Sequence, residues 1–116
     1  MRDPRERLRH ILEAIAQIKR YASRGRQAFE GDELIQSWVV HRLQIIGEAA
    51  RALPQAVRDR APDIPWSEMV GMRHVLVHDY FGVDTEMVWG VVERGLPPLK
   101  QKIEALLAAL ERDPAA

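Results

Sequence analysis

The sequence predicts an all-α protein, a small bundle of four to five helices. Apolar residues recur at helical spacing along most of the chain, and no segment shows the apolar–polar alternation of a half-buried strand. The 116 residues are enough for one modest core. We therefore expect a single domain over residues 1–116, with a frayed tail from about residue 111.

The first predicted helix runs from Pro4 to about Ser23. Proline suits a first helical turn, and the apolar residues that follow it have the i, i+3, i+4, i+7 spacing of one helix face: Leu8, Ile11, Leu12, Ile15, Ile18 and Ala22. The polar stretch from Gly25 to Gly31 is expected to end this helix.

A second helix is predicted from Asp32, a favourable N-cap residue, through Leu53. Its main apolar stripe is Ile35, Val39, Leu43, Ile46, Ala50 and Leu53, and Leu34, Trp38 and Ile45 widen it. One neighbouring helix cannot cover so broad an apolar surface. We therefore expect this helix to be buried on two sides, with a partner subunit as one candidate for the second side.

The prolines after the second helix predict a connector over Pro54–Pro65, with one short helical turn. A third helix begins near Trp66 and Ser67 and continues to the region Tyr80–Gly82, where a glycine suits a helix end. The tryptophans of the chain stand at apolar helical positions and are expected to anchor the core or an interface.

Asp84 or Thr85 is expected to cap a fourth helix. The pair Pro97–Pro98 should break or kink that helix. A last helical segment then runs from Leu99 to Leu110, because its leucines and Ile103 recur at helical spacing.

Composition restricts the function classes. The chain has no cysteine, which excludes disulfides and thiolate metal sites and fits a reducing cytosol. No apolar run approaches the length of a membrane span, so we expect a cytoplasmic protein without membrane contact. The net charge is zero, but residues 1–26 hold eight Lys/Arg and three Asp/Glu. This basic first helix could follow a phosphate backbone, pair with an acidic partner, or be a solvated face.

The stretch GMRHVLVHDYFGVD concentrates polar chemistry in a helical segment. Arg73, His74, His78, Asp79 and Tyr80 stand within eight residues, around an apolar Val-Leu-Val. A core would not tolerate these side chains without partners. The segment is therefore either a polar seam against a partner or a reactive site.

The spacing of Arg73 and His78 suits chemistry on a phosphate. The two positions are about 140° apart around a helix, so they flank a common groove, which a second copy in a two-fold dimer could complete. Arginine matches phosphate geometry, and histidine can accept or donate a proton near neutral pH. With Asp79 assisting, such a cluster could cleave RNA without a metal or cofactor and leave a 2′,3′-cyclic phosphate.

Two structural alternatives apply to the same residues. Arginine and histidine on one helix often form an ion-pair seam that only supports the fold. His74 and His78, at i and i+4, could instead bind zinc, but they lack the glutamate of HExxH and a third ligand is not evident. His10 and His41 are isolated in the sequence and are expected at the surface or half-buried.

The segment Arg73–Tyr80 matches R-x4-H-x-Y, the signature of the HEPN superfamily. The stretches IIGEAARALP (Ile45–Pro54), IPWSEMVGMRHVLVHDYFGVD (Ile64–Asp84) and VWGVVERGLPPLKQKI (Val88–Ile103) resemble the HepT branch of that superfamily. The resemblance covers nearly the whole chain. It implies an all-α HEPN bundle that forms a homodimer and acts as a ribonuclease toxin.

The resemblance also implies roles for individual residues. Arg73 and His78 would form the active site at the dimer interface. The partner would be a small MntA-type nucleotidyltransferase antitoxin, in a pair of the type VII kind, which transfers AMP from ATP to Tyr80. The toxin and antitoxin could assemble into a larger complex. The AMP would block an RNA phosphate by its charge and bulk.

The chain departs from the family pattern at His74, where a small polar residue, commonly Asn or Asp, is usual. His74 could orient the substrate, act as an extra acid or base, or weaken catalysis. A competing hypothesis is therefore a non-catalytic helical module that binds a nucleotide or its partner. A DNA-binding repressor fits less well, because Pro54–Pro65 is too long for a helix-turn-helix turn and no candidate recognition helix is basic.

Overall fold

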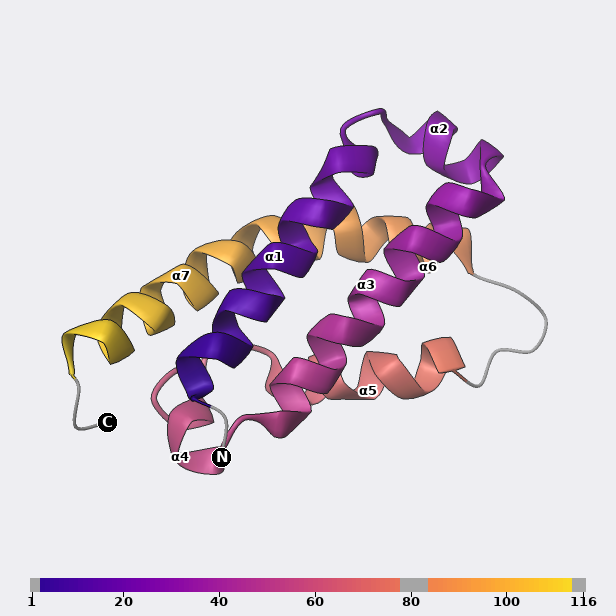
Figure 1. Cartoon of the computed structure of the whole chain (residues 1–116). Helices are drawn as coiled ribbons and strands as arrows, with labels where there is room; N and C mark the ends of the chain where they lie inside the picture. The colour runs from indigo at the N-terminus through magenta and orange to yellow at the C-terminus, as the bar shows by residue number, and fades with distance from the viewer. Residues whose placement is uncertain (1–2, 78–83, 114–116) are drawn as a thin grey trace.

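The computed structural model describes residues 3–77 and 84–113, with the backbone alone for residues 73–77. Every element in these ranges is helical (Figure 1): α1 (Pro4–Ala22), α2 (Arg26–Gly31), α3 (Glu33–Ala52), α4 (Gln55–Arg58), α5 (Trp66–Val77), α6 (Thr85–Gly90), the π-helical turn η1 (Val91–Gly95) and α7 (Leu96–Arg112). The predicted all-α bundle is confirmed. The long segments are α1, α3, α5 and the run α6–η1–α7, and α2 and α4 are short additions.

Helix α3 is the central element of the bundle. It packs against α1 on one side and α5 on the other, while α1 also packs against α7 (Figure 1). The core lies between these helices, and its fully buried members include Leu8, Ile11 and Ile18 of α1, Val39 of α3 and Ile103 of α7. Because α5 is held mainly through α3, the position of the helix on which the predicted reactive segment begins depends on α3.

Side-chain caps fix where the helices begin. The Asp32 carboxylate accepts hydrogen bonds from the backbone N–H groups of Leu34 (2.9 Å) and Ile35 (3.3 Å). Asp84 likewise accepts from the N–H of Met87 (3.0 Å), so both predicted N-caps are confirmed. Asp3 caps α1, and its hydrogen bonds with Arg5 lower its pKa to about 2.

The stretch Gly25–Gly31 was expected only to end the first helix, but it contains the short helix α2. Gly25 adopts a φ of 97°, a conformation that L side chains rarely adopt, and the chain then re-enters a helix. Phe29 is fully buried, and its ring centroid lies 5.4 Å from that of Trp89 in α6. The Phe29 ring anchors this turn to the bundle, together with the Gln36 side-chain amide of α3, which donates to the carbonyls of Phe29 (3.0 Å) and Glu30 (3.1 Å).

Of the two effects expected of Pro97–Pro98, a break in the helix is wrong, because helical structure continues from Thr85 to Arg112. The two prolines stand in the first turn of α7, directly after the wider π-helical turn η1. The N–H of Leu96 donates to the carbonyl of Val91, an i→i+5 bond. The wider turn carries the chain into a segment that starts at Leu96 rather than Leu99.

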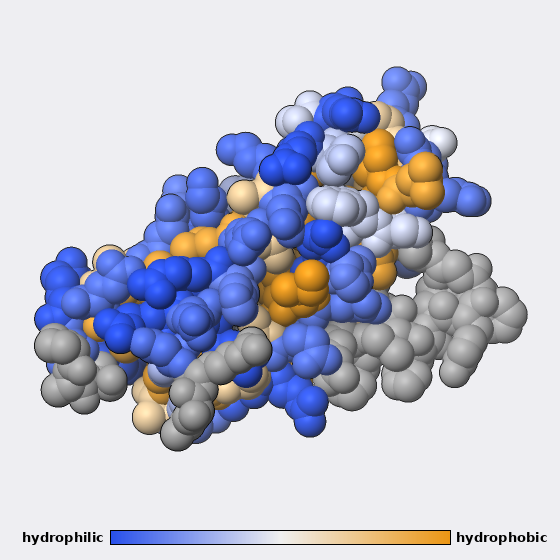
Figure 2. Space-filling view, in the orientation of Figure 1, coloured by the Kyte–Doolittle hydropathy of each residue, from blue (hydrophilic) through white to orange (hydrophobic). Residues whose placement is uncertain are grey.

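The second apolar side of α3 is only partly covered by the chain itself. Trp38 is half-buried against the Tyr21 ring (centroids 5.5 Å apart) and below the Arg42 guanidinium (3.7 Å from the ring centroid). Leu34, in contrast, is 81% exposed. Figure 2 shows a mostly hydrophilic face over α1 and α3, with apolar residues gathered near α2 and the start of α3.

Within the described ranges, no helix is long and apolar enough to cross a membrane.

Candidate active site

The predicted reactive segment begins within α5. Arg73 and His74 belong to this helix, which confirms the predicted start at Trp66 and the helical setting of both residues. The expected continuation of the helix to Tyr80–Gly82, and with it His78, Asp79 and Tyr80, lies outside the described residues. The structure therefore gives the helix that presents the motif, and the mutual arrangement of the five side chains stays a prediction.

The start of α5 is anchored by Trp66. Its indole N–H donates to two backbone carbonyls of the preceding connector, Arg58 (3.2 Å) and Ala61 (3.0 Å), and the residue is 9% exposed. Ile64 and Met69 are buried on either side of it in sequence. These contacts set the position from which α5 runs toward Arg73.

A groove of about 410 Å³ opens between α5 and the run α6–η1–α7. Its lining is mainly apolar and comes from four helical segments: Leu43 and Ile46 of α3, Pro65, Glu68, Met69 and Met72 at α5, Met87, Gly90, Val91, Arg94 and Gly95 of α6–η1, and Leu96 and Leu99 of α7. This groove lies beside the helix that carries Arg73. We call it the α5 groove.

Sequence reasoning missed two charged residues of the α5 groove. Glu68 and Arg94 line it from α5 and η1, and both are exposed. Neither forms an ion pair or hydrogen bond with another residue in the described part of the chain. They are 26 positions apart in sequence, so no local pattern could have paired them.

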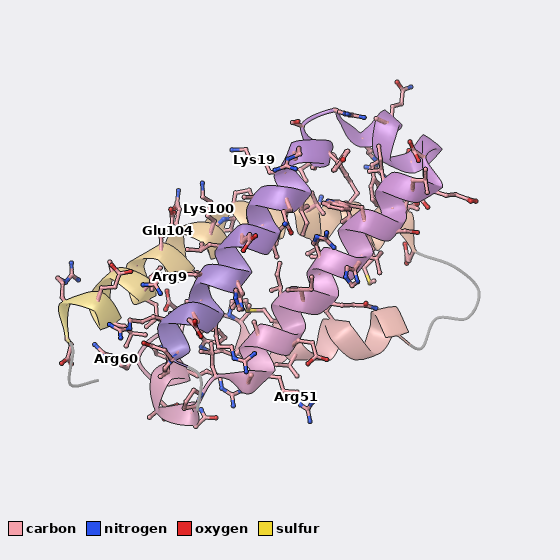
Figure 3. The ribbon with its side chains drawn as sticks, viewed as in Figure 1. Arg9, Lys19, Arg51, Arg60, Lys100 and Glu104 are labelled. Carbon is pink, nitrogen blue, oxygen red and sulfur yellow. The ribbon has the colours of Figure 1, made fainter. Side chains whose placement is uncertain are left out.

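The basic first helix is partly neutralised within the fold. Arg9 of α1 contacts Glu111 of α7 (3.5 Å), and Arg5 contacts Asp3 (2.6 Å). Figure 3 shows Lys19 of α1 with Lys100 and Glu104 of α7, and these three residues line a separate groove of about 360 Å³ between the two helices. The two positive charges there are thus accompanied by a carboxylate.

His10 and His41, isolated in the sequence, are brought together by the fold. Both are exposed, as expected, and they line a shallow depression of about 320 Å³ between α1 and α3, together with Arg7, Gln44 and Glu48. Among the residues that the structure describes, no three His, Asp or Glu side chains come together as metal ligands would. The suggested pair His74 and His78 falls outside that comparison.

The described architecture defines the class: a small helical bundle in which α5, the helix that carries Arg73, runs beside an apolar groove. The sequence matches the family described as ribonuclease HepT-like over residues 11–106, and the chain belongs to this family. The resemblance to the HepT branch of the HEPN superfamily is thereby confirmed, and membership places the chain among ribonucleases.

Relatives from archaea and bacteria support the assignment. The chain is 39% identical over 106 residues to a protein of Thermococcus cleftensis named "Probable ribonuclease HepT", covering 90% of this chain and 96% of the relative. It is 35% identical over 108 residues to a "Putative RNase" of Caldanaerobacter subterraneus, and the match covers 92% of this chain and 96% of that relative.

One of the relatives is about twice as long as the part that matches this chain. The chain is 37% identical over 107 residues to a "Gamma-glutamylcyclotransferase and putative RNase" of Methanocaldococcus jannaschii, covering 91% of this chain. It spans only about half (48%) of that relative's length. No solved structure matches the chain significantly.

Replacement of Trp66 by Phe tests how α5 is positioned. We expect the free energy of unfolding to fall by about 1–3 kcal/mol, because two carbonyls in a partly buried connector lose their donor. Urea denaturation measures the change. Trp38→Phe is the matched control: its indole also donates to one carbonyl, that of Gln17, but Trp38 is half-buried and water can replace the donor. An equal loss in both variants would contradict the anchoring role of Trp66.

Proposed function

We propose that this protein is the toxin of a type VII-like toxin–antitoxin pair, a metal-independent endoribonuclease that acts in the cytoplasm. The observation that carries the proposal is the family match over residues 11–106, which includes the whole R-x4-H-x-Y segment. The ribonuclease class follows from the family. The residues of the site, the pairing with an antitoxin and the modification are the proposal.

In the proposed reaction, the ribose 2′-oxygen attacks the neighbouring phosphorus, and the bond from phosphorus to the 5′-oxygen breaks. His78 acts as the general base that takes the 2′-hydroxyl proton or the general acid that protonates the leaving 5′-oxygen. Arg73 stabilises the additional negative charge of the pentavalent phosphorane. The products are a 2′,3′-cyclic phosphate and a 5′-hydroxyl.

A homodimer would supply the second histidine that such a reaction needs. One His78 could then serve as base while His78 of the partner subunit serves as acid, with two arginines around the phosphate. The apolar side of α3 that the chain leaves partly uncovered, most evidently at Leu34, supports a subunit contact. His74 and Asp79 are assigned assisting roles: they would orient the His78 ring or stabilise its protonated form.

The proposed partner is an MntA-like nucleotidyltransferase antitoxin, which could join the toxin dimer in a larger complex. In this step the Tyr80 hydroxyl attacks the α-phosphorus of ATP, AMP is attached to the tyrosine oxygen, and pyrophosphate leaves. The added phosphate brings negative charge close in sequence to Arg73 and His78. It would repel the RNA phosphate and occupy its place.

Removal of either motif residue tests the enzyme directly. Arg73→Ala and His78→Ala are each expected to lower the rate of RNA cleavage in EDTA by at least about 100-fold, because each removes charge stabilisation or proton transfer. The substrate is a set of fluorescent RNAs, and intact mass establishes beforehand that the protein carries no AMP.

The matched controls are His10→Ala and His41→Ala, which remove exposed histidines and should leave cleavage unchanged. Wild-type cleavage by Arg73→Ala or His78→Ala would refute the assigned roles. If the unmodified wild type binds the antitoxin tightly but cleaves no RNA, the non-catalytic binding module becomes the better account.

Tyr80→Phe tests the modification. When the protein is incubated with the nucleotidyltransferase and ATP, we expect the wild type to gain the mass of AMP and lose its ribonuclease activity. The variant should gain no mass and keep its activity, because it lacks the acceptor hydroxyl. Tyr21→Phe, which removes the only other tyrosine hydroxyl of the chain, should behave as the wild type. AMP found on Tyr80→Phe would place the acceptor elsewhere.

A further inference from the structure

We propose that the α5 groove binds a guanine base of the RNA substrate, with Glu68 and Arg94 as the residues that select it. This inference rests on the proposed function, since it assigns the substrate specificity of the same ribonuclease. It adds a binding site and two specificity residues that the motif does not contain.

The groove has the size and walls of a site for a small planar ligand. Its volume of about 410 Å³ falls within the range of about 300–1,000 Å³ that is common for such sites. Its walls include Met69, Met72 and Met87, and methionine side chains adapt to flat ligands and contact aromatic rings favourably. A base that entered the groove would bury its faces against these side chains.

The charged groups of the groove match the edge pattern of guanine. A guanidinium can donate two hydrogen bonds to O6 and N7 of guanine. A carboxylate can accept two from its N1–H and N2–H groups, and these adjoin O6 along the base edge. Arg94 and Glu68 line the groove from η1 and α5, and neither forms an ion pair or hydrogen bond with another described residue. Adenine, cytosine and uracil each lack part of this donor and acceptor pattern.

Gly90 contributes to this arrangement by leaving room for Arg94. A Cβ atom at Gly90 would lie 2.6 Å from Nη2 of Arg94, so the guanidinium rests against bare backbone one turn earlier in the helix. Any larger residue at this position would push the guanidinium away from its place in the groove. Gly90→Ala therefore displaces Arg94 without removing its charge.

The groove lies at a suitable distance from the proposed catalytic position. Arg73 follows Met69 by four residues on α5, which is about one helical turn, or roughly 6 Å along the axis. A nucleotide spans a similar distance from its base to its phosphate. A base held between Met69 and Arg94 would thus present the adjacent phosphate to the end of α5.

Methionine methyl NMR tests the groove without depending on activity. The chain has four methionines, and three of them line the groove. In protein with ¹³C-labelled methionine methyl groups, guanosine 3′-monophosphate is expected to shift the signals of Met69, Met72 and Met87 saturably. Adenosine, cytidine and uridine 3′-monophosphates should bind at least about fivefold more weakly, the lower end of discrimination by a good bidentate contact.

Three variants complete the design. Glu68→Gln and Gly90→Ala should each weaken guanosine 3′-monophosphate at least about fivefold and reduce its advantage over the other nucleotides. Glu104→Gln, which neutralises a carboxylate in the groove between α1 and α7, should bind as the wild type does. Circular dichroism and urea denaturation establish that each variant is folded.

Three outcomes would overturn the inference. The methyl signals could stay unchanged with every nucleotide, or shift equally with all four. They could instead shift only with protein concentration, which would show that a second copy of the chain occupies the groove. Guanine-selective binding without RNA cleavage would support guanine binding in the α5 groove and refute the proposed ribonuclease activity. Failure of this inference can therefore be told apart from failure of the proposed function.

Discussion

The burial of α3 between α1 and α5 is the interaction on which the rest of the structure depends. One side of α3 places Val39, Leu43 and Ile46 in the core. Because α5 packs mainly on α3, the same contact sets where α5 runs and how far it stands from α6–η1–α7. The α5 groove exists because α5 is supported by α3 on one side and faces those segments without closing onto them.

Most of the described core lies outside the helix that carries the start of the proposed motif. The buried apolar residues lie mainly along α1, α3 and α7, whereas Arg73, the first residue of the motif, belongs to α5. Trp66 anchors the start of that helix through two backbone carbonyls. A motif near a helix end can keep its polar side chains out of the core, which the proposed function requires because an RNA phosphate and a modifying enzyme must both reach them.

Much of the fold could be predicted because its signals are local. Asp32 and Asp84 cap their helices through backbone N–H groups only two or three residues away, and Trp66 begins α5 after a proline. Helix α2 could not be predicted, since one buried residue, Phe29, gives no periodicity. The π-helical turn could not be predicted either. A pair of prolines indicates a disturbed helix, but it does not say whether the helix ends or widens into a π-helical turn.

The candidate site likewise has one part that the sequence predicts and one part that it does not. The R-x4-H-x-Y segment is contiguous, so sequence alone could single out its residues and relate them to a family. Glu68 and Arg94 come from helices that meet only in the folded chain, and Met69 and Met72 stand at ordinary apolar positions of a helix. A groove built by tertiary structure leaves no local pattern in the sequence, even when a contiguous motif that begins on one of its helices can be recognised.

The nature of the cleaved end tests the central claim most directly. Unmodified protein in EDTA would be given an RNA with one cleavage site, and a matched RNA that carries 2′-deoxyribose at that site. Mass spectrometry should show a 2′,3′-cyclic phosphate and a 5′-hydroxyl from the first RNA, and no cleavage of the second, because the 2′-oxygen is the nucleophile. Cleavage of the deoxy RNA, or products with a 3′-hydroxyl and a 5′-phosphate, would contradict a metal-independent reaction through Arg73 and His78.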